Sequence, residues 1–343
     1  MGGGYNNGDY AQLYFPGTQT LGGTGSIIFG IGGNRSYLYA NGDNASNPAN
    51  LTIGSGVTIS GGNGYISGYY GGDSIVNDGI VDASASGCIV TLGSNGAFTN
   101  NGTLEATSGG TLSASNLSGN AATVIVNGSG SNATLNGTYV LNQSVSVAAG
   151  TALTLNGNWS NTAALSLAAS ATLYLGGSFT VAGLGTFTNS GGTVNLTGTL
   201  NNAGATLALS STTGSWNLDG GTISGGTVSA TPGVELILTN NGGALSGVTI
   251  ATGTVVDGTQ NYYANASIYG GLTLDGTLNL GGEYNNGNYA QLNFPGTQTL
   301  GGTGSIVFGI GYNPSYLYAN GDNCRNPANL TIGSGMTISG GNG

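Results

Sequence analysis

Short runs of alternating apolar and polar residues, separated by Gly and Asn, recur along most of the chain. The segments "GTALTLNGN" and "SATLYLGGSFTV" are typical, because Leu or Val alternates with Thr or Ser before Gly or Asn interrupts the run. Alternation with a period of two predicts a β-strand with one buried face, and no stretch shows the three-to-four spacing of a helix. The pattern therefore predicts an essentially all-β protein.

Equivalent apolar positions recur about every 21 residues. One series is Leu135, Leu155, Leu175, Leu196, Leu218 and Leu238, and a second is Val124, Val145, Leu165, Phe187, Leu207, Val228 and Val248. Such an interval holds about three short strands, with corners of Gly and Asn that tolerate sharp backbone turns. Stacked turns of this kind place equivalent residues about 4.8 Å apart. We therefore predict a parallel β-helix, or β-solenoid, with about three short strands per turn of roughly 21 residues.

The opening of the chain is repeated near its other end. Residues 2–64 match residues 281–343 at 54 of 63 positions. The nine differences include Gly4 to Glu283, Asp9 to Asn288, Tyr14 to Asn293, Gly33 to Tyr312 and Ala45 to Cys324. We interpret the chain as one unit of 279 residues followed by the start of the next tandem repeat.

Texture divides the chain into three segments. Residues 1–73 form a Tyr-rich repeated segment with wider turns, residues 74–280 a regular β-solenoid, and residues 281–343 the copy of residues 2–64. In the Tyr-rich segment we expect protruding loops around residues 5–10, 32–50 and 65–73. Four Asn-Asn pairs, at 100–101, 201–202, 240–241 and 285–286, are expected at corners, where their amides can stack as ladders.

Composition limits the possible partners. Charged residues make up 4% of the chain, with Arg35 and Arg325 as the only Lys, Arg or His, and the net charge is −10. Such a chain cannot neutralise phosphates, which excludes nucleic acid and anionic membranes. No run of 18 apolar residues predicts a membrane-spanning helix, so we expect no membrane insertion of this segment. The 38% apolar content is more than a disordered linker needs.

The start of the chain lacks the basic and then apolar layout of a secretory signal, so we expect a signal and an anchor outside this segment. Cys88 and Cys324 are too few for a disulfide framework, and Cys324 replaces Ala45 of the first copy. We expect both to be free or incidental.

Several phrases resemble a known family. "TLGGTGSIIFG", "LTIGSGVTISG", "VNDGIVDASASG" and "FTNNGTLEATSGGTL" resemble the repetitive regions of giant secreted bacterial surface proteins of the autotransporter-adhesin and filamentous-haemagglutinin type. The likeness covers nearly the whole chain but is one of style. It implies a β-helical, extracellular or cell-surface stalk, and no catalytic motif.

Carboxylates are the groups to inspect for catalysis or metal binding. Asp73, Asp78 and Asp82 form the densest group and are weak candidates for a Ca²⁺ site, although a solvated turn explains them as well. A polysaccharide lyase would need a cationic base, and both Arg lie in the repeated segment, where Arg35 becomes Pro314. We therefore expect no enzyme activity, no catalytic residues and no cofactor beyond that weak possibility of Ca²⁺.

Glycan acceptors are a further possibility, because Asn-x-Ser/Thr occurs thirteen times, slightly more often than this composition produces by chance. The possible acceptors are Asn34, Asn44, Asn50, Asn101, Asn116, Asn127, Asn132, Asn136, Asn142, Asn158, Asn195, Asn265 and Asn329.

Two functions follow from these features. The first is a structural repeat module of an extracellular fibre or stalk, whose partner is a further copy joined end to end or laterally. The alternative is an adhesin that binds carbohydrate or another cell through Tyr-rich loops. The residues proposed for that contact are Tyr5, Tyr10, Tyr37, Tyr39, Tyr65, Tyr69 and Tyr70.

Overall fold

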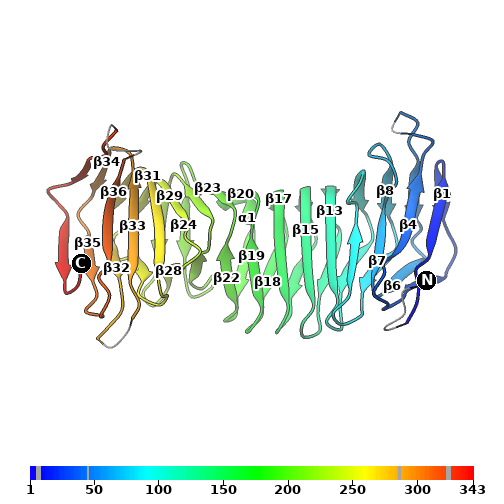
Figure 1. Ribbon diagram of the computed structural model, residues 1–343, viewed down its shortest axis with the longest axis horizontal. Helices are drawn as coiled ribbons and strands as arrows, with labels where there is room; N and C mark the ends of the chain where they lie inside the picture. Colours follow the sequence, from blue (N-terminus) through cyan, green and yellow to red (C-terminus); the bar gives the residue numbers. More distant parts are fainter. Residues whose placement is uncertain (5–8, 45, 285–286, 322–325) are drawn as a thin grey trace. The chain divides into compact units, whose positions relative to one another are not determined.

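Nearly all of the chain forms parallel β-strands that stack as a β-solenoid of about 14 turns (Figure 1). The computed structural model describes residues 1–343 except 5–8, 45, 285–286 and 322–325. Contacts divide the strands into two units, residues 1–177 with 183–192 and residues 178–182 with 193–343. Among the described residues the only helix is the single turn α1 (Val181–Leu184), and none is long and apolar enough to cross a membrane.

Strands of the first unit lie on three faces. The first face contains β1 (Gln12–Pro16), β4 (Ser36–Asn41), β7 (Gly64–Gly68), β10 (Ile89–Leu92), β13 (Thr111–Asn120), β15 (Asn132–Leu141), β17 (Ala152–Asn161) and β19 (Thr172–Leu175). The second contains β2 (Gln19–Leu21), β5 (Asn50–Ile53), β8 (Ser74–Asn77) and β11 (Ala97–Asn100), and continues in the later halves of β13, β15 and β17. The third contains β3 (Ser26–Phe29), β6 (Thr58–Gly61), β9 (Ile80–Ala83), β12 (Thr103–Ala106), β14 (Thr123–Val126), β16 (Val145–Val147), β18 (Ala164–Leu167) and β21 (Thr186–Asn189).

The second unit has the same three-faced plan. One face contains β22 (Thr193–Leu196), β25 (Trp216–Leu218), β28 (Glu235–Leu238), β30 (Val255–Gly258), β32 (Thr277–Leu280), β35 (Ser305–Phe308) and β38 (Thr337–Gly340). The next contains β20 (Ser178–Thr180), β23 (Thr199–Asn201), β26 (Thr222–Ser224), β29 (Ala244–Ile250), β31 (Ala264–Leu274), β33 (Ala290–Pro295) and β36 (Tyr316–Asn320). The last contains β24 (Thr206–Leu209), β27 (Thr227–Ala230), the later halves of β29 and β31, β34 (Gln298–Gly301) and β37 (Leu330–Ile332).

Ladders of aliphatic side chains fill the interior, which confirms the predicted parallel β-helix. Leu135, Leu155 and Leu175 are register partners on successive turns of the first unit. One predicted pair is wrong: Val228 is opposite Ile250 and not Val248, because the β29–β31 pairing shifts register after Ser246. The apolar lumen of the second unit leaves a cavity of about 10 Å³, too small for a water molecule.

Turns differ in length along the chain. In the regular region Asn132 pairs with Ala152, 20 positions further on. In the Tyr-rich segment Ser26 pairs with Thr58, 32 positions further on, and Ser305 of the second copy pairs with Thr337 at the same interval. The two copies therefore form the same strands, with β33 to β38 repeating β1 to β6. The proposed division at residues 73 and 280 stays a prediction.

Polar groups enter the interior at corners. Asn100 is buried and accepts a hydrogen bond from Asn77 Nδ2 at 2.7 Å, while its own Nδ2 donates to the carbonyl of Ala121 at 2.6 Å. Asn101, the other member of this pair, lies outside and donates to Asp78 at 2.8 Å. An inner amide thus satisfies backbone groups of the next turn, which a Leu at this position would leave unpaired.

Glycine is needed where successive turns approach most closely. Gly157 has φ +80°, and a Cβ at this position would lie 2.0 Å from the carbonyl oxygen of Gly137 on the preceding turn. A side chain there would push two stacked turns apart, so the corner excludes every residue except Gly.

Asp73 organises the wide turns of the first unit. Its carboxylate is fully buried, with Oδ1 accepting the backbone N–H groups of Gly42 at 3.1 Å and Ala49 at 2.7 Å. Oδ2 accepts those of Tyr69 at 3.1 Å and Tyr70 at 2.8 Å. One side chain therefore fixes the loop between β4 and β5 and the loop after β7, and all of its usual acceptor positions are engaged.

Two carboxylates face outward from neighbouring strands of the third face. Asp82 on β9 and Glu105 on β12 are register partners, and Asp82 accepts a hydrogen bond from the Thr107 hydroxyl at 2.8 Å. Partial burial raises the pKa of Asp82 above its ordinary value. The pKa of Glu105 is raised by burial and by the neighbouring charge of Asp82. This pair therefore favours the protonated state in the folded protein.

Replacing Asp73 with Asn is expected to open the wide turns locally. The amide nitrogen would face two N–H donors, and the loss is expected to be about 3 kcal/mol. Amide hydrogen exchange of Gly42, Ala49, Tyr69 and Tyr70 measures the free energy of local opening. Asp78→Asn is the matched control, since Asp78 bonds the exposed Asn101 amide, and its effect is expected to stay within about 0.5 kcal/mol. Equal effects of the two variants would contradict the assigned role.

Glu105→Gln is expected to raise the thermal unfolding temperature at pH 7. It removes a cross-strand repulsion of about 0.2–1 kcal/mol. Because the folded-state pKa values are raised, their contribution to stability is fully present below the ordinary carboxyl pKa and is lost as pH rises through the raised values. The difference between Glu105→Gln and wild type should therefore vanish as pH falls to about 4. A variant that is less stable at pH 7 would exclude the repulsion.

Candidate functional sites

The largest aromatic cluster lies on the first unit and is named here the tyrosine platform. It consists of Tyr10, Tyr14, Tyr37, Tyr39, Tyr65, Tyr69 and Tyr70, joined by ring contacts. Tyr39 is at its centre, stacked on Tyr14 and on Tyr37 with 5.5 Å between ring centroids in both cases. Outward positions of neighbouring strands produce this arrangement, because Tyr14 is opposite Tyr39 and Tyr37 is opposite Tyr65.

The platform presents neutral phenols. Burial, followed by the neighbouring Tyr rings, raises the pKa of Tyr39 to about 12. The hydroxyl groups of the platform include bonded ones, since Tyr14 donates to Gln12 Oε1 at 2.8 Å and Ser94 donates to Tyr65. The surface therefore combines aromatic faces with hydroxyl groups that donate and accept hydrogen bonds.

Sequence reasoning placed these tyrosines in loops, and the structure corrects this for three of them. Tyr37 and Tyr39 lie on β4 and Tyr65 lies on β7, whereas Tyr10, Tyr69 and Tyr70 lie outside strands. Tyr14 of β1 was missed, although its position between inward Leu13 and Phe15 is the sequence signal that places it outward. Tyr5 is outside the described residues.

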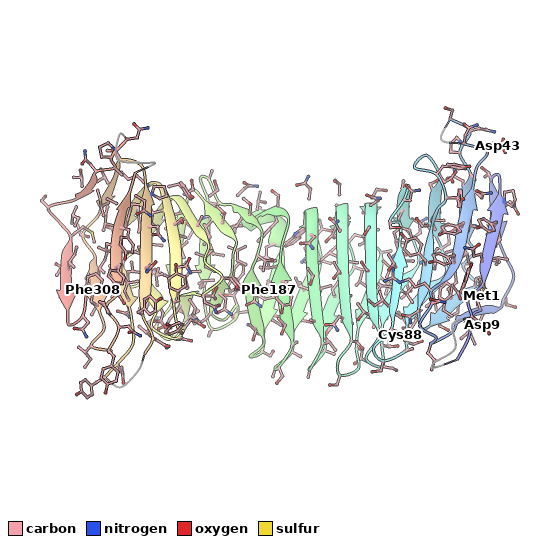
Figure 2. All side chains as sticks on the ribbon, in the orientation of Figure 1. Met1, Asp9, Asp43, Cys88, Phe187 and Phe308 are labelled. Atoms are coloured by element: carbon pink, nitrogen blue, oxygen red, sulfur yellow. The ribbon has the colours of Figure 1, made fainter. Side chains whose placement is uncertain are left out.

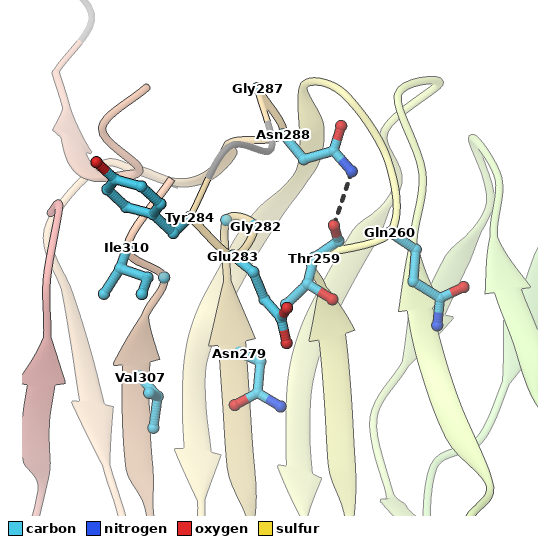
Figure 3. Close-up of a pocket in the computed structure, with 12 residues that line it drawn as sticks. Thr259, Gln260, Asn279, Gly282, Glu283, Tyr284, Gly287, Asn288, Val307 and Ile310 are labelled. Carbon is cyan, nitrogen blue, oxygen red and sulfur yellow. Dashed lines mark hydrogen bonds between the residues drawn. The ribbon is translucent and has the colours of Figure 1, made fainter. Parts of the chain in front are cut away.

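A groove of about 1050 Å³ opens on the second unit, beside the loop that follows β32 (Figure 3). It is lined by Thr259, Gln260, Asn279, Gly281, Gly282, Glu283, Tyr284, Gly287, Asn288, Val307, Gly309 and Ile310. Asn288 donates to the Thr259 carbonyl at 2.9 Å, and Gln260 donates to Asp257 at 2.7 Å. These bonds hold two walls of the groove, and the Glu283 side chain lies between them and Tyr284 (Figure 3). Sequence reasoning did not single out this site.

The three aspartates proposed for Ca²⁺ have different environments. Asp73 is wrong as a metal ligand, because four backbone N–H groups already occupy its carboxylate. Asp78 accepts a bond from Asn101, and Asp82 one from Thr107. In the part of the chain that the structure describes, no three His, Cys, Asp or Glu side chains are grouped as metal ligands would be.

Most of the possible glycan acceptors lie at the surface. Ten of the thirteen Asn are exposed, and Asn142 and Asn265 are half-buried. Asn195 is wrong as an acceptor, because its side chain is 8% exposed and accepts a hydrogen bond from Asn217 at 2.8 Å. Cys88, labelled in Figure 2, is a buried free thiol, and Cys324 is outside the described residues.

Comparison with known proteins does not assign the chain to a family. No family model matches it, and no curated protein matches it. Among solved structures, it is similar to the crystal structure of a TibC-catalyzed hyper-glycosylated TibA55-350 fragment, over 96% of this chain and 98% of that chain. The sequences are 16% identical and the TM-score is 0.24, so this likeness carries no argument about function. The β-solenoid established by strand pairing is the fold that the resemblance to autotransporter adhesins implies.

Proposed function

We propose that this chain is a non-catalytic structural module of an extracellular or cell-surface fibre, which extends by joining its ends to further copies. The resemblance of its repeats to secreted surface proteins supports the location. The observation that carries the proposal is the difference in exposure between identical residues of the two copies.

The end turn, β36 to β38, exposes apolar residues that the same sequence buries elsewhere. Ile332 is 46% exposed, while its equivalent Ile53 is fully buried beneath β8. The start turn, β1 to β3, behaves in the same way, because Leu13 is 38% exposed and its equivalent Leu292 is 1% exposed. Both turns also present strand edges, which attract further strands.

A joint between the two turns would use contacts that the chain already makes. Within the first unit, Leu13 pairs with Leu38, Leu21 with Ile53, and Ile27 with Ile59. Placing the start turn of one copy on the end turn of another brings together the same residue types, at Leu317, Ile332 and Ile338. Each fully buried aliphatic side chain contributes about 1.5–3 kcal/mol, so three inward columns favour association.

Ile332→Asp is expected to abolish end-to-end association while leaving the subunit folded, because Ile332 is already exposed and a buried carboxylate at the joint is costly. Sedimentation velocity over a concentration series, with electron microscopy of the wild type, measures the assembly. Ile125→Asp is the matched control, since Ile125 is 37% exposed on β14 at the side of the solenoid. A wild type that stays monomeric at high concentration, or equal behaviour of the two variants, would refute the proposal.

The second candidate function is carbohydrate or cell binding by the tyrosine platform. The specific observation in its favour is that seven rings form one contact network on an outward sheet face. Aromatic faces pack against the C–H face of a sugar ring, and phenol hydroxyls bond its hydroxyls.

If this candidate is correct, Tyr39→Ala should weaken binding to an oligosaccharide array at least about tenfold, since it removes the central ring. Tyr174→Ala is the control, because Tyr174 lies on β19 of the same unit and outside the platform. Thermal unfolding of both variants separates lost binding from lost folding. An unchanged affinity of Tyr39→Ala would rule the platform out.

A further inference from the structure

The groove beside β32 is built by residues that distinguish the second copy from the first. Three of its lining residues differ between the copies: Glu283 replaces Gly4, Asn288 replaces Asp9, and Val307 replaces Ile28. A fourth difference, Tyr312 for Gly33, adds a ring that contacts Tyr284 at 5.9 Å between centroids. Four of the nine differences therefore gather at one surface, while the inward residues of the strands are kept.

From this clustering we infer that the groove is a binding site for a neutral oligosaccharide. Its charge excludes an anionic ligand, because the only charged side chain lining it is Glu283 and the chain carries a net charge of −10. The described cation Arg35 belongs to the first copy, and its equivalent here is Pro314.

The polar groups of the groove match hydroxyls better than a cation. Gln260, Asn279 and Asn288 each carry an amide that donates and accepts hydrogen bonds, and Glu283 adds an acceptor. A sugar hydroxyl also donates and accepts, so neighbouring hydroxyls pair with both kinds of group. A cation would use only the acceptors and leave the amide donors facing it.

Apolar groups complete the site. Tyr284, Ile310 and Tyr312 are 68%, 56% and 66% exposed, which leaves their surfaces open to a ligand. A sugar ring has an apolar C–H face that packs on such groups, as an ion does not. The groove volume of about 1050 Å³ accommodates several linked rings.

The test is a printed array of neutral and uronate-containing oligosaccharides, followed by titration calorimetry with any glycan retained. Glu283→Gly and Tyr312→Gly restore the residues of the first copy, and each is expected to weaken binding of a neutral glycan at least about tenfold. Glu283→Gln keeps an acceptor and should have a smaller effect. Tyr14→Asn makes the opposite exchange, placing the second copy's residue in the tyrosine platform, and should leave this affinity unchanged.

Each other outcome overturns the inference. Retention of uronate glycans alone, or of no neutral glycan, would remove the proposed ligand class. Binding that Tyr14→Asn weakens and Glu283→Gly does not would place the ligand on the tyrosine platform. Repeating the titration in Ile332→Asp separates this result from assembly, because the groove contains no residue of the end turn. Thermal unfolding of each variant shows that the solenoid remains folded.

Discussion

Stacking of each turn on the turns beside it is the interaction on which this protein depends. A single turn has two or three inward side chains per face and cannot bury them alone. Parallel strands fix the spacing between turns, so equivalent residues such as Leu135, Leu155 and Leu175 contact one another directly. The same constraint requires Gly at close corners such as Gly157, and amides such as Asn100 where backbone groups turn inward.

Because neighbours supply stability, the outer surface is free to vary. The Leu, Ile and Phe ladder is almost identical in residues 2–64 and 281–343, whereas Gly4, Tyr14 and Gly33 have changed to Glu283, Asn293 and Tyr312. Substitution at outward positions costs little because these side chains have solvent on one side. The two copies thus show how one backbone can present a tyrosine platform in one place and an acid-bearing groove in another.

The fold was readable from the sequence because its signals are local and repeated. Alternation located strands, and the spacing of leucines gave the turn length of 20 to 22 residues that the register confirms. What sequence could not give depends on contacts between turns. Asp73 looked like part of a surface acidic group, but loops brought together by wide turns surround it. Tyr14 was missed since its partner Tyr39 is 25 positions away, and the groove requires loops after β30 and β32 to meet.

Variable turn length also determines how a unit yields to tension. The hydrogen bonds between turns lie roughly along the solenoid axis, so an axial pull loads all strands of one turn together and releases turns singly from an end. A turn of 20 residues, as between Asn132 and Ala152, releases roughly 70 Å of extended chain, and one of 32 residues, as between Ser26 and Thr58, roughly 110 Å. The Tyr-rich turns therefore give the longest extension per rupture, and act as the more compliant part of the material.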